Sequence, residues 1–183
     1  MGLFDSIAKA FKKGEVKEPF KKEEVKESFT KDKAEWQYHS CLEEYCKLNN
    51  KKENEITEKE QEFIWECSGL LISYFLTWLI NNNYINAEEA DISEDAINAV
   101  KERKIKTTEF FGRELDYTLT KEDISENIIG FVDDYYNNVF YKDYPEYMEK
   151  VSGKNLFCCE FSWKDYDNIE KIIDNAYTKY KNK

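Results

Sequence analysis

The residues best suited to catalysis or metal binding lie close together near the start of the domain. His39 is the only histidine in the chain, and Cys41 and Cys46 follow it. A Ser-His-Asp or Cys-His catalytic centre would have to use this histidine, yet no nucleophile elbow and no cysteine-protease signature accompanies it. The three side chains also lack the short, paired spacing of zinc ligands. We therefore expect no catalytic residue and no metal site, with Trp36, Tyr38 and Cys41 packed and His39 half exposed.

Two adjacent cysteines, Cys158 and Cys159, lie in a short apolar segment, residues 155–161, that fits an isolated strand. Side chains alternate between the two faces of a strand, so one thiol is expected to point inward and the other outward. No redox motif surrounds the pair. We expect two ordinary cysteines rather than a redox centre.

A stripe of polar and small residues runs along the apolar segment that begins near residue 57. At 100° per residue its members fall within about 60° of one another. They are Glu62, Glu66, Gly69, Ser73 and Thr77. The stripe fits either a pocket in which Glu66 has a shifted pKa, or close packing against a second helix while both glutamates reach solvent. We expect the packing. The scattered glycines form no phosphate-binding loop, so we expect no cofactor.

The segment 131–147 is rich in tyrosine and aspartate and is the best candidate for binding a partner. Tyrosine supplies a large contact area at low entropic cost, and adjacent carboxylates suit a basic protein. The predicted contact residues are Asp133, Asp134, Tyr135, Tyr136, Tyr141, Asp143, Tyr144 and Tyr147. About half of the tyrosine rings in the segment are expected in the core. The alternative is a helix end whose rings cover the core while their hydroxyls stay in water.

The net charge of -11 is unevenly distributed. Residues 1–31 hold eight lysines against six acidic residues, which gives +2, whereas residues 32–183 hold nineteen basic and thirty-two acidic residues, which gives -13. A domain of this charge repels a phosphate backbone and attracts basic partners. We expect a basic protein partner and no nucleic acid.

Residues 1–31 form a tail with its own pattern. Residues 3–13 fit an amphipathic helix whose apolar and lysine-bearing faces do not mix, which favours weak contact with a membrane surface. The predicted membrane-binding residues are Leu3, Phe4, Ile7, Lys9, Phe11, Lys12 and Lys13. A nine-residue repeat follows, FKKGEVKEP and then FKKEEVKES, and predicts a solvated linker.

The location of the protein is inferred from its cysteines and its apolar runs. Five cysteines, an odd number at no disulfide-framework spacing, favour a reducing compartment. The first lysines follow the apolar residues instead of preceding them, unlike a secretory signal. The apolar run 67–80 is too short to cross a bilayer and predicts a buried core helix. We expect a cytoplasmic protein, with the inner face of the membrane as an alternative location.

The remaining pattern predicts a mainly α-helical single domain, residues 32–183, with at most a minor β element. Helices are expected at 57–81 behind a Thr57 cap, from Asp91 or Ser93 through Val100, at 120–140 behind a Thr120 cap, and at 164–180. Pro145 is expected in a loop, and Gly153 at the end of a short turn.

The domain resembles an uncharacterised family of bacterial proteins of unknown function that includes immunity-type genes. The likeness rests on residues 32–38 (DKAEWQY), 75–80 (FLTWLI), 109–110 (EF), 119–123 (LTKED), 141–144 (YKDY) and 162–167 (SWKDYD). Members often carry one histidine between the Trp and the Tyr of the first motif and another in the central helix, where this chain has Gln37 and Leu71. The resemblance implies a fold and no activity.

Taken together, these patterns predict a non-enzymatic protein-interaction module, of immunity type, that binds a basic partner. A peripheral membrane adaptor that docks through residues 3–13 is the first alternative. An enzyme that uses Glu62, Glu66 or His39 in an acidic pocket is the second.

Overall fold

The computed structural model describes residues 28–183. The predicted amphipathic helix, its membrane-binding residues 3–13 and nearly all of the repeat lie outside these residues, so membrane contact stays a prediction. The folded domain begins slightly earlier than expected. Phe29, which the repeat placed in the linker, is 1% exposed and belongs to the hydrophobic core.

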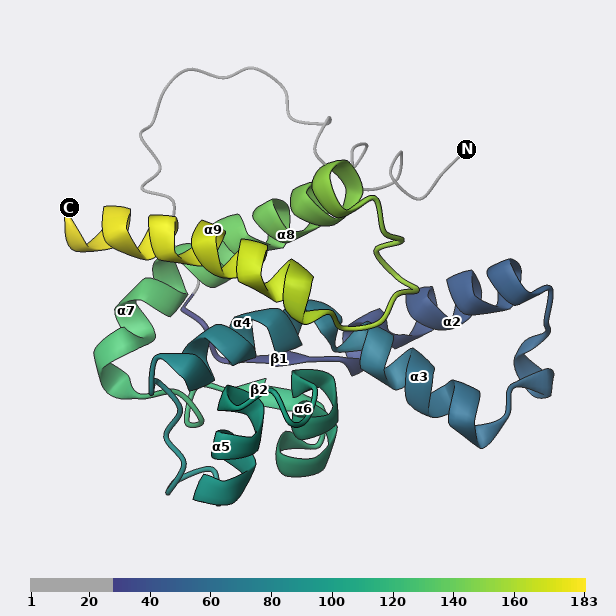
Figure 1. Ribbon diagram of the computed structural model, residues 1–183, viewed down its shortest axis with the longest axis horizontal. Coiled ribbons are helices and arrows are strands. Elements are labelled where there is room, and N and C mark those ends of the chain that lie inside the picture. Colours follow the sequence, from purple (N-terminus) through teal and green to yellow (C-terminus); the bar gives the residue numbers. More distant parts are fainter. Residues whose placement is uncertain (1–27) are drawn as a thin grey trace, which may run out of the picture.

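Helix α4 (Leu70–Asn81) lies at the centre of the domain, with α7 to α9 on one side and α5 and α6 on the other (Figure 1). Ten of its twelve residues are buried, which confirms the predicted core helix. Among the described residues no single helix is long and apolar enough to span a membrane, and α3 and α4 pass that test only as a bent pair.

The expected single helix over 57–81 is two helices, α3 (Glu58–Ser68) and α4, which meet at Gly69 with a bend of 62°. Glycine is a poor helix former, and here it also permits a close contact. A Cβ on Gly69 would lie 3.0 Å from Cδ1 of Phe111. The predicted cap is confirmed, because Thr57 Oγ1 accepts from the Glu60 N–H and the Glu60 carboxylate accepts from the Thr57 N–H.

Helix α2 (Glu35–Asn49) and α3 form a helical hairpin closed by η1 (Glu53–Glu55) (Figure 1). The sequence patterns did not predict α2. Cys41 is the only buried residue of α2, so the helix has a narrow apolar stripe and a weak periodic pattern in the sequence. At the closed end of the hairpin, Glu60 accepts hydrogen bonds from Lys51 and Tyr45.

The two strands of the sheet come from distant parts of the chain. β1 (Lys31–Lys33) pairs antiparallel with β2 (Thr118–Thr120), and Asp32 lies opposite Leu119. The strand expected at 155–161 is wrong, since this segment is a loop without strand pairing. Segment 155–161 has no neighbouring strand with which to pair, whereas β1 and β2 pair with each other beside α6.

Helix α5 (Glu94–Lys101) begins at the predicted Ser93 cap, whose Oγ accepts from the Ala96 N–H. Helix α6 (Thr107–Leu115), which was not predicted, packs against α4. The Oγ1 atoms of Thr77 and Thr107 lie 2.7 Å apart. Together with the contact at Gly69, this confirms that the stripe of small residues packs against a helix.

The segment from α7 (Glu126–Tyr135) to Gly153 is helical throughout, through η2 (Tyr136–Phe140), α8 (Tyr141–Tyr147) and η3 (Met148–Ser152). Pro145 lies inside α8, so the expected loop is wrong. Wider π-helical turns, η2 and η3, flank α8 on both sides. Gly153 ends the segment with φ of 66°, as expected.

Two predicted helix starts have different outcomes. The Thr120 cap is wrong, because Asp123 accepts from the Thr120 N–H and closes a turn, and α7 begins only after Ser125. The last helix is confirmed as α9 (Trp163–Lys181), where Ser162 Oγ accepts from the Asp165 N–H. The domain is therefore mainly α-helical with a small two-stranded sheet.

Candidate functional site

Four of the five tyrosines predicted to bind a partner lie in the core. Tyr135, Tyr136, Tyr144 and Tyr147 are at most 5% exposed, and Tyr141 is half-buried. The prediction of an exposed tyrosine surface is wrong for these four, because the continuous helix turns one face towards α4 and the π-helical turn brings Tyr136 onto that face. Their position predicts a structural role for the rings.

Three of these tyrosines hydrogen-bond to buried carboxylates. Tyr136 and Tyr141 both donate to Oδ2 of Asp32, at 2.8 and 2.5 Å, and Tyr147 donates to Asp165 at 3.0 Å. Burial raises the pKa of Asp32, and the two tyrosine hydroxyls oppose this by stabilising its charged form. Sequence reasoning missed Asp32, since no local pattern shows that residue 32 meets residues 136 and 141.

The three predicted aspartates take separate roles. Asp133 accepts from the Phe29 N–H at 2.6 Å and so holds the start of the folded domain. Asp134 forms a salt bridge with Lys183 at 2.6 Å, and Asp143 accepts from the Tyr135 hydroxyl at 2.9 Å. The structure therefore brings Asp134, Tyr135 and Asp143 together and directs Asp133 elsewhere.

These three residues border an open groove between the α7–η2 segment and α9, with a volume of ≈ 490 Å³. Apolar and aromatic side chains supply most of its lining. The lining consists of Phe131, Asp134, Tyr135, Val139, Asp143, Ile172, Asn175, Ala176, Lys179, Tyr180 and Lys183. Val139 is 39% exposed, so an apolar side chain at the border of the groove reaches solvent.

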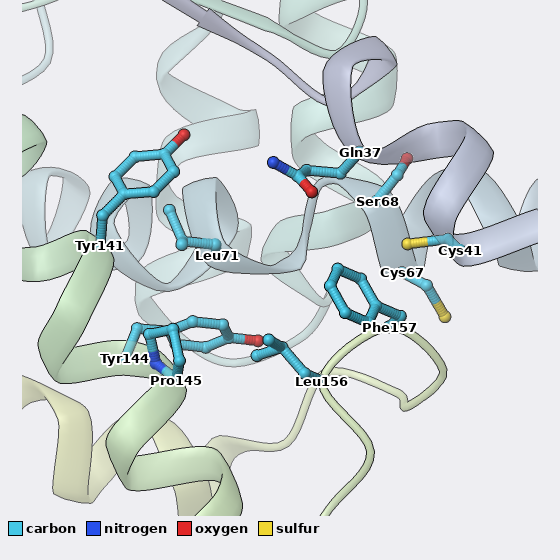
Figure 2. A pocket seen from close by; sticks show the side chains of 10 residues that line it. All are labelled: Gln37, Cys41, Cys67, Ser68, Leu71, Tyr141, Tyr144, Pro145, Leu156 and Phe157. Carbon is cyan, nitrogen blue, oxygen red and sulfur yellow. The ribbon is translucent and has the colours of Figure 1, made fainter. Parts of the chain in front are cut away.

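A second concave site, a cavity of ≈ 120 Å³, lies between α2, the α3–α4 bend, α8 and the loop that precedes α9. Its lining is mostly apolar, as Figure 2 shows, and consists of Gln37, Cys41, Cys67, Ser68, Leu71, Tyr141, Tyr144, Pro145, Leu156 and Phe157. Gln37 and Leu71, the two positions at which the family resemblance expects histidine, both line it although they lie on different helices. None of the lining residues is charged.

One polar atom in this cavity has no partner. Within residues 28–183 the Tyr144 hydroxyl is fully buried and forms no hydrogen bond. Burial keeps the nearby thiols protonated, because it raises the pKa of Cys41 to about 12 and that of Cys67 further. The Cys67 thiol donates to the Cys159 carbonyl oxygen at 3.4 Å. The cavity is thus neutral, and its fully buried hydroxyl is unsatisfied.

The residues expected near position 40 do not assemble into a reactive site. The His39 side chain is 74% exposed and lies 3.0 Å from Glu43, and Trp36 is 57% exposed rather than packed. Cys158 and Cys159 are both half-buried in a loop, so the expected contrast between a buried and an exposed thiol is not found, although Cys159 packs against the core. In the described part of the chain no three His, Cys, Asp or Glu side chains cluster as metal ligands do.

Glu66 is the half-buried member of the expected glutamate pair, and Glu62 is exposed. Burial raises the pKa of Glu66, while the charge of Lys106 and a hydrogen bond from Thr108 oppose the rise. Thr108 belongs to α6, so Glu66 lies at the helix contact instead of in either concave site.

A family model described as "Domain of unknown function (DUF7832)" matches residues 30–157. The chain belongs to this family. The DUF7832 region runs from β1 to the loop before α9, so it contains every residue that lines the neutral cavity, whereas α9 and one wall of the groove lie beyond it. No curated protein and no solved structure matches the chain.

Proposed function

We propose that this DUF7832 protein is a non-enzymatic interaction module that binds a basic protein partner in the groove between α7–η2 and α9. The observation that carries the proposal is Val139, 39% exposed beside an apolar groove of ≈ 490 Å³. A groove of this kind suits the apolar face of an amphipathic helix, whose side chains enter at helical spacing.

The charge of the domain supports a basic partner. Residues 32–183 carry nineteen basic and thirty-two acidic residues, and this excess of negative charge attracts a cationic protein over a distance. The groove itself is mixed, because Asp134 and Asp143 stand beside Lys179 and Lys183. We therefore assign the long-range attraction to the whole domain and the affinity to the apolar contact.

The finer proposal is an immunity-like bacterial protein that neutralises a basic partner, such as a toxin, in the cytoplasm. Five free thiols support a reducing compartment, where disulfides are rare. A neutralising protein of this type needs only a surface that is complementary to its target and no chemistry of its own.

The test compares two exposed valines, both in π-helical turns. Val139 borders the groove, whereas Val151, which is 70% exposed, does not. The tagged full-length chain and the variants Val139→Lys and Val151→Lys are purified from the native host in low salt, and the associated proteins are identified by mass spectrometry.

The proposal expects one basic protein with the wild type and with Val151→Lys, its release in high salt, and its loss with Val139→Lys. Thermal unfolding of both variants is the control that checks that they remain folded. Equal recovery with Val139→Lys, or binding that salt does not affect, contradicts the proposal.

A further inference from the structure

The Tyr144 hydroxyl is an unsatisfied polar group in the core of the domain. The residue is 2% exposed, and its hydroxyl has no partner among the described residues. A buried hydroxyl without a hydrogen bond destabilises a fold unless water or a ligand satisfies it, so such a group in a cavity calls for an occupant.

Tyr144 lines the neutral cavity. Figure 2 shows its hydroxyl pointing towards Leu156, while the amide of Gln37 enters the cavity from α2. Gln37 also forms no side-chain hydrogen bond within residues 28–183, whereas the Ser68 hydroxyl already donates to the Trp65 carbonyl oxygen at 2.8 Å. Two polar groups therefore remain available in an otherwise apolar space.

The cavity disfavours a charged occupant. No Asp, Glu, Lys, Arg or His lines it, and both lining thiols stay protonated at neutral pH. Asp32 does not line the cavity, and the Tyr141 hydroxyl, which belongs to a lining residue, already donates to it. A buried ion without a counterion loses far more hydration energy than the cavity returns.

The volume and the lining of the cavity further restrict the class of compound that it can bind. The volume of ≈ 120 Å³ approaches that of an engineered cavity of about 150 Å³ that binds benzene, so the occupant has roughly six to eight non-hydrogen atoms. The rings of Tyr141, Tyr144 and Phe157 suit a planar ring.

We propose that this cavity binds a small uncharged ring compound whose single oxygen hydrogen-bonds to the Tyr144 hydroxyl. The site is separate from the groove between α7–η2 and α9, and it shares no lining residue with it. Binding at one site is therefore measurable without the other.

Three probes of similar size test the proposal by NMR titration of the full-length protein: phenol, benzene and benzoate. Phenol carries a ring and one neutral oxygen, benzene lacks the oxygen, and benzoate adds a charge. We expect phenol to bind most tightly and benzene more weakly, with benzoate not binding. Failure of phenol to bind the folded wild type, or equal binding of benzoate, overturns the proposal.

A pair of buried tyrosines provides the matched variants. Tyr144→Phe is expected to weaken phenol binding about tenfold, equal to about 1.4 kcal/mol, and to leave benzene binding unchanged. Tyr147→Phe is the control, because Tyr147 is also buried but donates to Asp165 and does not line the cavity. An equal loss of phenol affinity in both variants counts against the assigned hydrogen bond.

A third variant fills the cavity from the loop before α9. Leu156 lies in this loop, so Leu156→Trp places a large ring in the site without a substitution in any of the helices that line it. We expect it to abolish the binding of both phenol and benzene while the thermal unfolding temperature stays near that of the wild type. Retained binding in this folded variant places the probes elsewhere and overturns the site.

Discussion

The hydroxyl of Tyr136 donates to Oδ2 of Asp32 over 2.8 Å and so joins the start of the folded domain to the helical segment that follows α7. The Tyr141 hydroxyl donates to the same oxygen, and the backbone N–H of Lys33 donates to Oδ1. Asp32 is 3% exposed, and no salt bridge among the described residues includes it. A buried carboxylate is thus held by two neutral hydroxyls and one backbone N–H.

This arrangement predicts how the stability of the fold depends on pH. Burial raises the pKa of Asp32 above its ordinary value of 3.8, so the folded state holds this proton more tightly than the unfolded state does. The stabilisation is complete below pH 3.8 and is lost as the pH rises through the folded pKa. The free energy of unfolding of the wild type, minus that of Asp32→Asn, is expected to fall over this window.

Urea unfolding of both proteins across the acidic to neutral range measures this difference. Glu149→Gln is the control for the loss of one acidic charge, because Glu149 is exposed. A difference that stays constant or rises for Asp32→Asn contradicts the assignment.

Two helical glycines should respond differently to alanine. Gly112 and Gly130 both lie inside helices, so each gains about 1 kcal/mol of helix propensity on substitution. A Cβ on Gly112 would lie 2.6 Å from Cζ of Tyr117, whose ring stacks on Trp65 and whose backbone is left-handed with φ of 55°. On Gly130 the closest atom is the hydroxyl oxygen of Tyr180, at the end of a partly exposed side chain.

We therefore expect Gly112→Ala to destabilise the domain by about 1–3 kcal/mol, as overpacking does, and Gly130→Ala to change its stability by less than about 1 kcal/mol. Chemical denaturation of the two variants at neutral pH tests this order. Equal effects of the two substitutions would contradict this prediction, because they would mean that the rings of Tyr117 and Tyr180 yield to the added methyl group equally.

Local signals in the sequence predicted the helix starts that depend on local contacts. Thr57 and Ser93, two of the predicted caps, each accept a hydrogen bond from an N–H three residues ahead, and a cap of this kind can be read from a few residues. The bend at Gly69 depends on Phe111, forty-two residues away, and no pattern within 57–81 reveals it. The prediction of a loop at Pro145 failed for the same reason, since the core contacts of α8 outweigh the local preference for a turn.

The candidate sites were less predictable than the fold. Composition marked the segment 131–147, but only tertiary packing decides which tyrosines face α4 and which acids reach the groove. The neutral cavity joins residues from four separate parts of the chain, among them Gln37, Leu71, Tyr144 and Phe157. The resemblance had singled out Gln37 and Leu71, and this was the one sequence signal that pointed to the cavity.

The salt bridge between Lys154 and Asp165 should stabilise the loop before α9. Burial raises the pKa of Asp165, but hydrogen bonds from Lys154 at 2.6 Å and from Tyr147 and Ser152 at 3.0 Å outweigh it, so the pKa lies below 3.8. This stabilisation is present above pH 3.8 and is lost as the pH falls through the folded pKa.

Lys154→Met is expected to lower the free energy of unfolding by about 1 kcal/mol at pH 7, a modest value because the lysine is partly exposed and water screens the pair. The difference from the wild type should shrink in acid, where Asp165 becomes protonated. Lys150→Met, which removes an exposed pair with Glu146, is the control and should have a smaller effect. A loss that grows towards low pH contradicts this prediction.

The cysteines should separate into reactive and protected thiols. Cys41 is 1% exposed, and burial together with the nearby Cys158 and Cys159 raises its pKa to about 12. Cys67 is 5% exposed and its pKa is also raised, mainly by burial. Cys46 is half-buried on the same helix as Cys41. Because the thiolate is the reacting form, iodoacetamide at pH 8 should modify Cys46 well before Cys41 or Cys67.

Mass spectrometry of peptides after timed alkylation measures the order. In concentrated guanidinium chloride all three thiols should react at similar rates, because unfolding removes the burial that separates them. Phenol at saturating concentration should further slow the modification of Cys41 and Cys67, which line the neutral cavity, and leave that of Cys46 unchanged. Native alkylation of Cys41 as fast as that of Cys46 would mean that the cavity opens to solvent far more often than its packing predicts.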